Sequence, residues 1–144
     1  MGRLIRISFI CVFLLISFSM NSQSIIGKWK TIDAQDGGKE KSIVEIYEEN
    51  GKIFGKIIEI LNPEDKDAIC TKCEGEDKNR PILGLVLIKN MIKHGKYYKK
   101  GTIFHPEHGK TFRCRLQLTE DFNLLQVRGY VAFLYATQYW ERVE

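Results

Sequence analysis

The sequence predicts an all-β domain built from about eight short antiparallel strands. Beyond the first 22 residues, apolar and polar side chains alternate with a period of two, and turn signals recur at short intervals. Strands separated by such short turns favour consecutive hairpins over units in which helices connect parallel strands. About eight strands fit either a two-sheet sandwich or a closed barrel, and periodicity alone does not distinguish these architectures.

The strands are placed along the chain by this alternation and by the turns between them. The hairpin around Asn50-Gly51 is the most distinct, because Asn-Gly adopts the positive φ angles of a type I′ turn. The window from Leu85 to Lys93 has a second interpretation as one short helix. The predicted strands are Ile26–Ile32, Ser42–Glu48, Lys52–Ile60, Leu83–Ile88, Lys96–Phe104, Lys110–Leu118, Leu124–Phe133 and Thr137–Val143.

Residues 1–22 have the pattern of a cleavable secretory signal peptide. Arg3 and Arg6 precede an apolar run of fourteen residues, Ile7 to Met20, and a polar stretch follows it. The run is shorter than the roughly 20 apolar residues that a membrane-spanning helix needs. We therefore predict export to the periplasm or the extracellular space, a single domain over residues 23–144, and no stable membrane anchor after cleavage.

The 122 residues that follow the signal peptide suffice for one hydrophobic core but not for two. They contain 20 basic and 18 acidic residues, which gives a net charge of +2, and no run of basic residues stands out. So small an excess of charge predicts neither a nucleic-acid partner nor a membrane-surface partner.

The longest break in the alternation is a charged loop, Asn62–Pro81, which carries Cys70 and Cys73. A loop of this length in a compact domain is usually functional or mobile. In an oxidising compartment, a Cys-x-x-Cys pair favours a structural disulfide that shapes the loop. A redox pair and a metal site are the alternatives, the latter because His105 and His108 would add two imidazoles to two thiolates.

Nothing in the sequence predicts an enzyme. Neither a Gly-x-Ser-x-Gly nor a His-Glu-x-x-His motif occurs, and the chain has three histidines. Cys114 shares its strand face with apolar residues, so we expect it to be buried and free. We assign no catalytic residue, no metal ligand and no cofactor.

The two ends of the domain carry a resemblance to a known superfamily. Gly27-Lys28-Trp29 opens the first strand, and Trp140-Glu141-Arg142 closes the last. This arrangement resembles the Gly-x-Trp signature of the lipocalin and fatty-acid-binding (calycin-type) proteins, in which the tryptophan plugs one end of a barrel beneath an arginine. The resemblance implies a lipocalin-like barrel with structural roles for Gly27, Trp29 and Arg142. Arg142 is favoured over Arg128 as the residue that contacts Trp29.

The whole domain also resembles a bacterial family of exported proteins of unknown function with lipocalin-like folds. The resemblance implies a fold and no activity. The matching segments run in order through the chain: 27–29, 44–47, 51–57, 70–73, 101–103, 109–112, 127–130 and the Trp140 ending.

Arg128-Gly129-Tyr130 resembles the Arg-x-Tyr element with which fatty-acid-binding proteins hold a carboxylate inside the barrel. In those proteins the element lies on the final strand, whereas here another strand follows. Alternation places Arg128 and Tyr130 on one face of their strand. On an inner face they would bind an anionic head group, and on an outer face they would be ordinary surface residues.

These observations together predict an exported binding protein for a small apolar or amphipathic ligand, such as a fatty acid. One alternative is a structural or protein-interaction module whose barrel is filled by its own side chains. Another is a metal-binding protein that uses the Cys-x-x-Cys loop.

Overall fold

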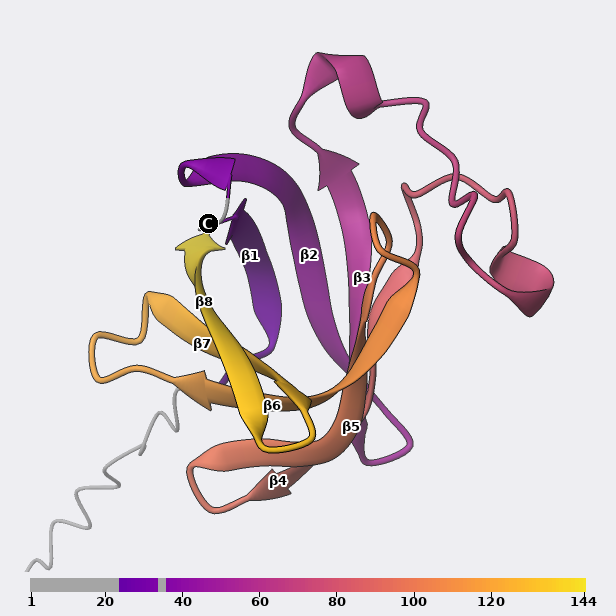
Figure 1. Ribbon diagram of the computed structural model, residues 1–144. Helices are drawn as coiled ribbons and strands as arrows, with labels where there is room; N and C mark the ends of the chain where they lie inside the picture. Colours follow the sequence, from indigo (N-terminus) through magenta and orange to yellow (C-terminus); the bar gives the residue numbers. More distant parts are fainter. Residues whose placement is uncertain (1–23, 34–35) are drawn as a thin grey trace, which may run out of the picture.

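Each predicted hairpin joins two neighbouring strands of a closed antiparallel barrel, which the computed structural model shows in Figure 1. The structure describes residues 24–33 and 36–144, so the predicted signal peptide lies outside the described residues. Strands pair in sequence order, and the first pairs with the last. The strands are β1 (Gly27–Asp33), β2 (Lys39–Glu49), β3 (Lys52–Ile60), β4 (Val86–His94), β5 (Tyr97–His105), β6 (Lys110–Leu118), β7 (Leu124–Val131) and β8 (Leu134–Val143). The prediction of an all-β barrel of about eight strands is confirmed.

Two local predictions need correction. The strand predicted over Leu83–Ile88 is β4 (Val86–His94), which begins three residues later and continues six residues further, so the alternative of a short helix in this window is wrong. The last hairpin turns at Ala132, whose φ of 53° reverses the chain. Strand β7 therefore ends at Val131, and β8 begins at Leu134, three residues earlier than predicted.

Trp29 closes one end of the barrel. Its side chain is fully buried, and its indole nitrogen donates a hydrogen bond to the Ile25 carbonyl oxygen at 2.8 Å. The guanidinium of Arg142 lies 4.3 Å from the indole ring centroid and donates to two carbonyl oxygens, those of Phe122 and Ser24. A β-carbon at Gly27, where φ is 140°, would lie 3.3 Å from the same guanidinium. Glycine is therefore the residue that fits beside it.

The apolar core continues from Trp29 along the barrel axis. It is built from the inward residues of every strand, as the alternation predicts. Its fully buried members on the strands are Trp29, Val44, Ile46, Ile88, Met91, Leu116 and Leu125.

The segment between β3 and β4, residues 61–85, is a structured loop held by backbone hydrogen bonds and a disulfide. Cys70 and Cys73 are bonded to each other, with their α-carbons 5.3 Å apart, so this prediction is confirmed. An isolated bridge joins Ile69 to Pro81, and the helical turns η2 (Pro63–Asp65) and η3 (Gly75–Asp77) shape the rest. Within the described ranges, no helix has the length and apolar character needed to cross a membrane.

Gly101 marks the place where β5 lies closest to β4. A β-carbon at this position would overlap the carbonyl oxygen of Lys89 and lie 2.7 Å from the amide nitrogen of Met91. Both atoms belong to the backbone, so neither can rotate away. At Gly129 of β7, by contrast, the nearest atom to an added β-carbon would be that of Phe112 at 3.5 Å, an ordinary contact.

We predict that Gly101→Ala lowers the free energy of unfolding by about 2 kcal/mol or more, because the new methyl group separates two paired strands. Gly129→Ala is the matched control and should change it by less than about 1 kcal/mol. Urea unfolding followed by tryptophan fluorescence measures both values. Equal losses in the two variants would contradict the close approach of β4 and β5.

Cys114 is a second testable feature of the core. The residue is 4% exposed, and burial raises the pKa of its thiol to about 12. The thiolate is the reactive form, so the folded protein should not react with a thiol reagent at mildly alkaline pH. In residues 23–144, unfolding should expose one reactive thiol, and reduction should expose two more. Rapid labelling of the native protein would show that the strand faces are assigned wrongly.

Candidate functional site

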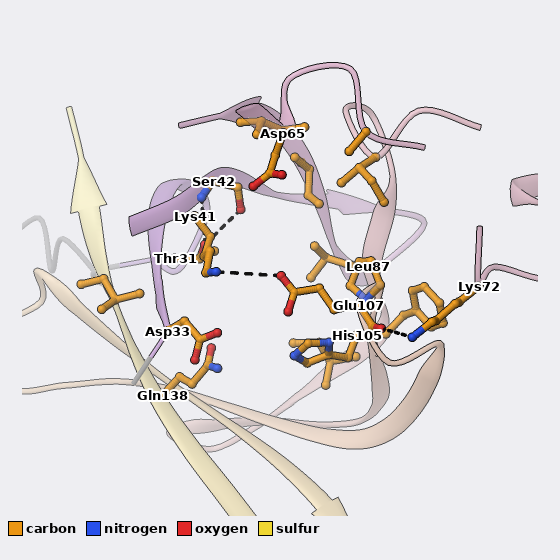
Figure 2. Close-up of a pocket in the computed structure, with 18 of the residues that line it drawn as sticks. Thr31, Asp33, Lys41, Ser42, Asp65, Lys72, Leu87, His105, Glu107 and Gln138 are labelled. Carbon is orange, nitrogen blue, oxygen red and sulfur yellow. Dashed lines mark hydrogen bonds and ion pairs between the residues drawn. The ribbon is translucent and has the colours of Figure 1, made fainter. Parts of the chain in front are cut away.

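A cavity of about 340 Å³ opens at the barrel end opposite Trp29. The residues of this cavity come from both the strands and the 61–85 loop, which forms one of its walls (Figure 2). Ligand pockets in proteins begin at roughly 300 Å³, so the cavity suits a small molecule. Its apolar lining includes Ile57, Ile60, Leu87, Ile103, Phe104 and Trp140.

A β-bulge brings two successive residues of β2, Lys41 and Ser42, to this cavity. Strand β1 pairs regularly with β2 as far as Lys30, and pairing resumes at Ile32, so two β2 residues oppose Thr31. A bulge of this kind re-aims side chains that strict alternation would separate. The hydroxyl oxygens of Thr31 and Ser42 lie 3.0 Å apart in a hydrogen bond, and both residues are buried.

Both lysines that line the cavity already have acceptors. The ammonium of Lys41 donates to the Asp36 carboxylate at 2.8 Å and lies 3.9 Å from that of Glu107, which Figure 2 shows across the cavity. The hydrogen bond to Asp36 raises the pKa of Lys41. Lys72 donates to the Glu107 carbonyl oxygen at 2.8 Å. Since Asp33 and Asp65 also line the cavity, its rim carries more acids than bases.

His105 ends β5 at the cavity wall. Its ring lies 4.3 Å from that of His108, centroid to centroid. Burial lowers the pKa of His105, and the neighbouring His108 lowers it by a smaller amount. The imidazole of His105 is therefore neutral at neutral pH. Within residues 24–33 and 36–144, the buried Nδ1 of His105 has no hydrogen-bond partner. Buried polar atoms without a hydrogen-bond partner are uncommon in folded proteins, so this nitrogen marks the site as unusual.

The Cys-x-x-Cys loop and the turn with the two histidines meet at this end of the barrel. Lys72 contacts the turn through Glu107, and a β-carbon at Gly109 would lie 2.7 Å from that of Lys72. The two cysteines are joined in a disulfide and therefore do not offer thiolates to a metal. In the part of the chain that the structure describes, no three His, Cys, Asp or Glu side chains are grouped to hold a metal ion.

Arg128 and Tyr130 lie on the outer face of β7, away from the cavity. Their neighbours Leu125 and Val127 are buried in the core, so alternation turns Arg128 and Tyr130 outward. Arg128 donates to the Thr137 hydroxyl at 2.9 Å and lies over the Tyr135 ring. Of the two alternatives that the sequence left open for Arg128 and Tyr130, the structure therefore has the outer face, because the inner face of β7 holds the apolar residues.

Sequence reasoning missed the polar residues that do face the cavity. Thr31 and Asp33 lie two and four residues after Trp29 on β1, so alternation places them on the same inward face. The sequence alone could have shown this. The inward turn of Lys41 had no such signal, because it depends on the bulge between β1 and β2.

Comparisons with known proteins agree with this geometry. Residues 27–142 match the family model described as "Uncharacterized protein conserved in bacteria (DUF2147)". Among solved structures, the chain is similar to protein HP1028 from the human pathogen Helicobacter pylori, described as belonging to the lipocalin family. The TM-score is 0.72 at 24% sequence identity, with 84% of each chain covered, and this likeness concerns the fold. The comparison with curated proteins gave no match. The chain therefore belongs to the bacterial family DUF2147 and has the lipocalin-like barrel that its sequence predicted.

Proposed function

We propose that the protein binds a small amphipathic molecule in the cavity at the open end of the barrel. The observation that carries this proposal is an apolar interior with, at its rim, the buried Nδ1 of His105, which has no hydrogen-bond partner among the described residues. Apolar pockets with a few placed polar groups are the usual form of a small-molecule site. The apolar part of the ligand would lie among the strand side chains, and its polar end would reach His105.

The polar end of this ligand is best matched by an uncharged hydrogen-bonding group. Lys41 and Lys72 are already engaged with Asp36 and the Glu107 backbone, so a carboxylate would have to displace existing acceptors. The excess of acids at the rim also disfavours an anion. A neutral imidazole can exchange one hydrogen bond with a hydroxyl or amide. An alcohol or an acylglycerol is therefore a better candidate than the fatty acid that the sequence suggested.

Export through a signal peptide over residues 1–22 belongs to the same proposal. The disulfide between Cys70 and Cys73 supports it, because such bonds persist in oxidising compartments. An exported binding protein would meet its ligand in the periplasm or outside the cell.

We predict that decanol binds saturably and more tightly than decanoate, as measured by isothermal titration of residues 23–144. His105→Phe keeps a ring of similar size but loses the nitrogen, and should weaken decanol binding about three- to tenfold, the worth of one hydrogen bond. His94→Phe is the matched control, because His94 is exposed at the end of β4. Arg128→Ala should leave the affinity unchanged.

Two results would count against the proposal. The absence of saturable binding by any of these amphiphiles, with no molecule retained in native mass spectrometry, would favour a barrel filled by its own side chains. Equal weakening by His105→Phe and His94→Phe would remove His105 from the site.

A further inference from the structure

Strand pairing gathers three arginines on the outer wall of the barrel. Arg115 of β6 stands directly opposite Arg128 of β7, and Arg113 lies two residues along, opposite Tyr130. All three alternate with core residues and therefore face outward. Like charges directly opposite each other across a strand pair are destabilising, so this arrangement favours a partner that supplies negative charge.

No carboxylate of the described residues pairs with these arginines. Their hydrogen bonds go to neutral oxygens: Arg113 to the Ala132 carbonyl, Arg115 to the Gln126 side chain and Arg128 to the Thr137 hydroxyl. In residues 24–33 and 36–144, every ion pair has a lysine as its cation. The Nε of Arg115 is buried and has no hydrogen-bond partner in those residues.

Tyrosines surround this cluster on the same wall. Arg115 lies 4.5 Å from the Tyr97 ring centroid, and Arg128 lies 4.2 Å from that of Tyr135. Tyr130 pairs with Tyr135 across β7 and β8. We call the three arginines and these three tyrosines the arginine–tyrosine face.

An exposed apolar hairpin tip adjoins this face. From the last residue of β7 to the first of β8 the chain reads Val131-Ala132-Phe133-Leu134, and residues Phe133 and Leu134 are 90% and 65% exposed. Arg113 holds the tip from its base through its 3.3 Å hydrogen bond to the Ala132 carbonyl. Neighbouring apolar side chains this exposed mark an interaction surface rather than scattered surface residues.

We propose that this side of the barrel docks onto a membrane that carries anionic phospholipids. The hairpin tip would enter the acyl region, and the arginines at its base would meet the phosphate groups, which guanidinium binds in paired geometry. Tyrosines are enriched at the same interfacial depth. A soluble polyanion would use the arginines but leave the apolar tip in water, so the two features together select a lipid surface.

Docking in this way places the cavity mouth at the bilayer. Val131 and Leu134 of the tip also line a second hollow, about 420 Å³ in volume, which shares His105 with the cavity. An amphipathic ligand could then pass between membrane and barrel without crossing water. Membrane docking itself goes beyond the proposed ligand binding and does not depend on it.

Co-sedimentation with lipid vesicles tests the proposal on residues 23–144, which contain every strand of the barrel. Residues 1–22 are omitted because their apolar run would bind lipid on its own. Binding is expected to vesicles of equal parts phosphatidylcholine and phosphatidylglycerol, to weaken with added salt, and to be much weaker to phosphatidylcholine alone. Equal binding to both vesicle types, or binding to neither, would overturn the proposal.

Matched variants separate the two parts of the surface. Arg113→Gln with Arg128→Gln should weaken binding about 30-fold, from the usual contribution of each basic residue near an anionic surface. Lys28→Gln with Lys52→Gln removes the same charge from exposed positions elsewhere and should have little effect. Arg113→Lys with Arg128→Lys keeps the charge and should retain most of the binding. An equal loss of vesicle binding in the lysine-to-glutamine control would show that the net charge of the protein, and not the arginine–tyrosine face, determines binding, and would overturn the proposal.

The hairpin tip is tested by Phe133→Ser, which should weaken vesicle binding about tenfold or more. Phe122→Ser is its control, at a position 42% exposed in the turn between β6 and β7. Unchanged binding by Phe133→Ser, or capture by heparin without capture by vesicles, would show a soluble polyanion site instead. Decanol titration of the arginine variants in lipid-free buffer should match the parent, which distinguishes failure of docking from failure of ligand binding.

Discussion

Closure of the barrel depends on a short contact between its first and last strands. Strands β1 and β8 pair through three residue pairs, of which Trp29 with Arg142 is the middle one. Next to it, Lys30 forms ion pairs with Glu40 and Glu141, whose carboxylates lie 2.7 and 3.4 Å from its ammonium. Without this contact, β1 and β8 would both be open edges. At the same place the buried Trp29, beneath Arg142, closes one end of the barrel, and the cavity opens at the other end.

The entrance is shaped by departures from regular sheet geometry. The bulge opposite Thr31 turns Lys41 toward the cavity, and the disulfide-linked 61–85 loop provides a wall that strands alone do not supply. Burial keeps the imidazole of His105 neutral at this entrance. In the part of the chain that the structure describes, both lysines of this cavity have acceptors, whereas Nδ1 of His105 has no hydrogen-bond partner.

The two faces of β7 have different roles. Inward, Leu125 and Val127 fill the core, and outward, Arg128 joins the arginines of β6. The side of the barrel on which the Arg-x-Tyr pattern lies was not visible in the sequence, because it depends on which face of β7 is turned inward. No basic run appears in the sequence because these arginines are separated along the chain and meet only through strand pairing.

The sequence by itself determined the all-β class and most of the strands, and its resemblance to lipocalin-like proteins implied the barrel and its closed end. Alternation with closely spaced turns placed most of the strands, because this pattern is local. The resemblance carried by the Gly-x-Trp and Trp-x-Arg segments implied that Trp29 would meet Arg142. The pair Cys70 and Cys73 was equally local. Only the tertiary structure decided which face of β7 is inward, where the bulge at Thr31 falls and how His105 meets the loop. These depend on register and on contacts between segments distant in sequence, which no single strand pattern encodes.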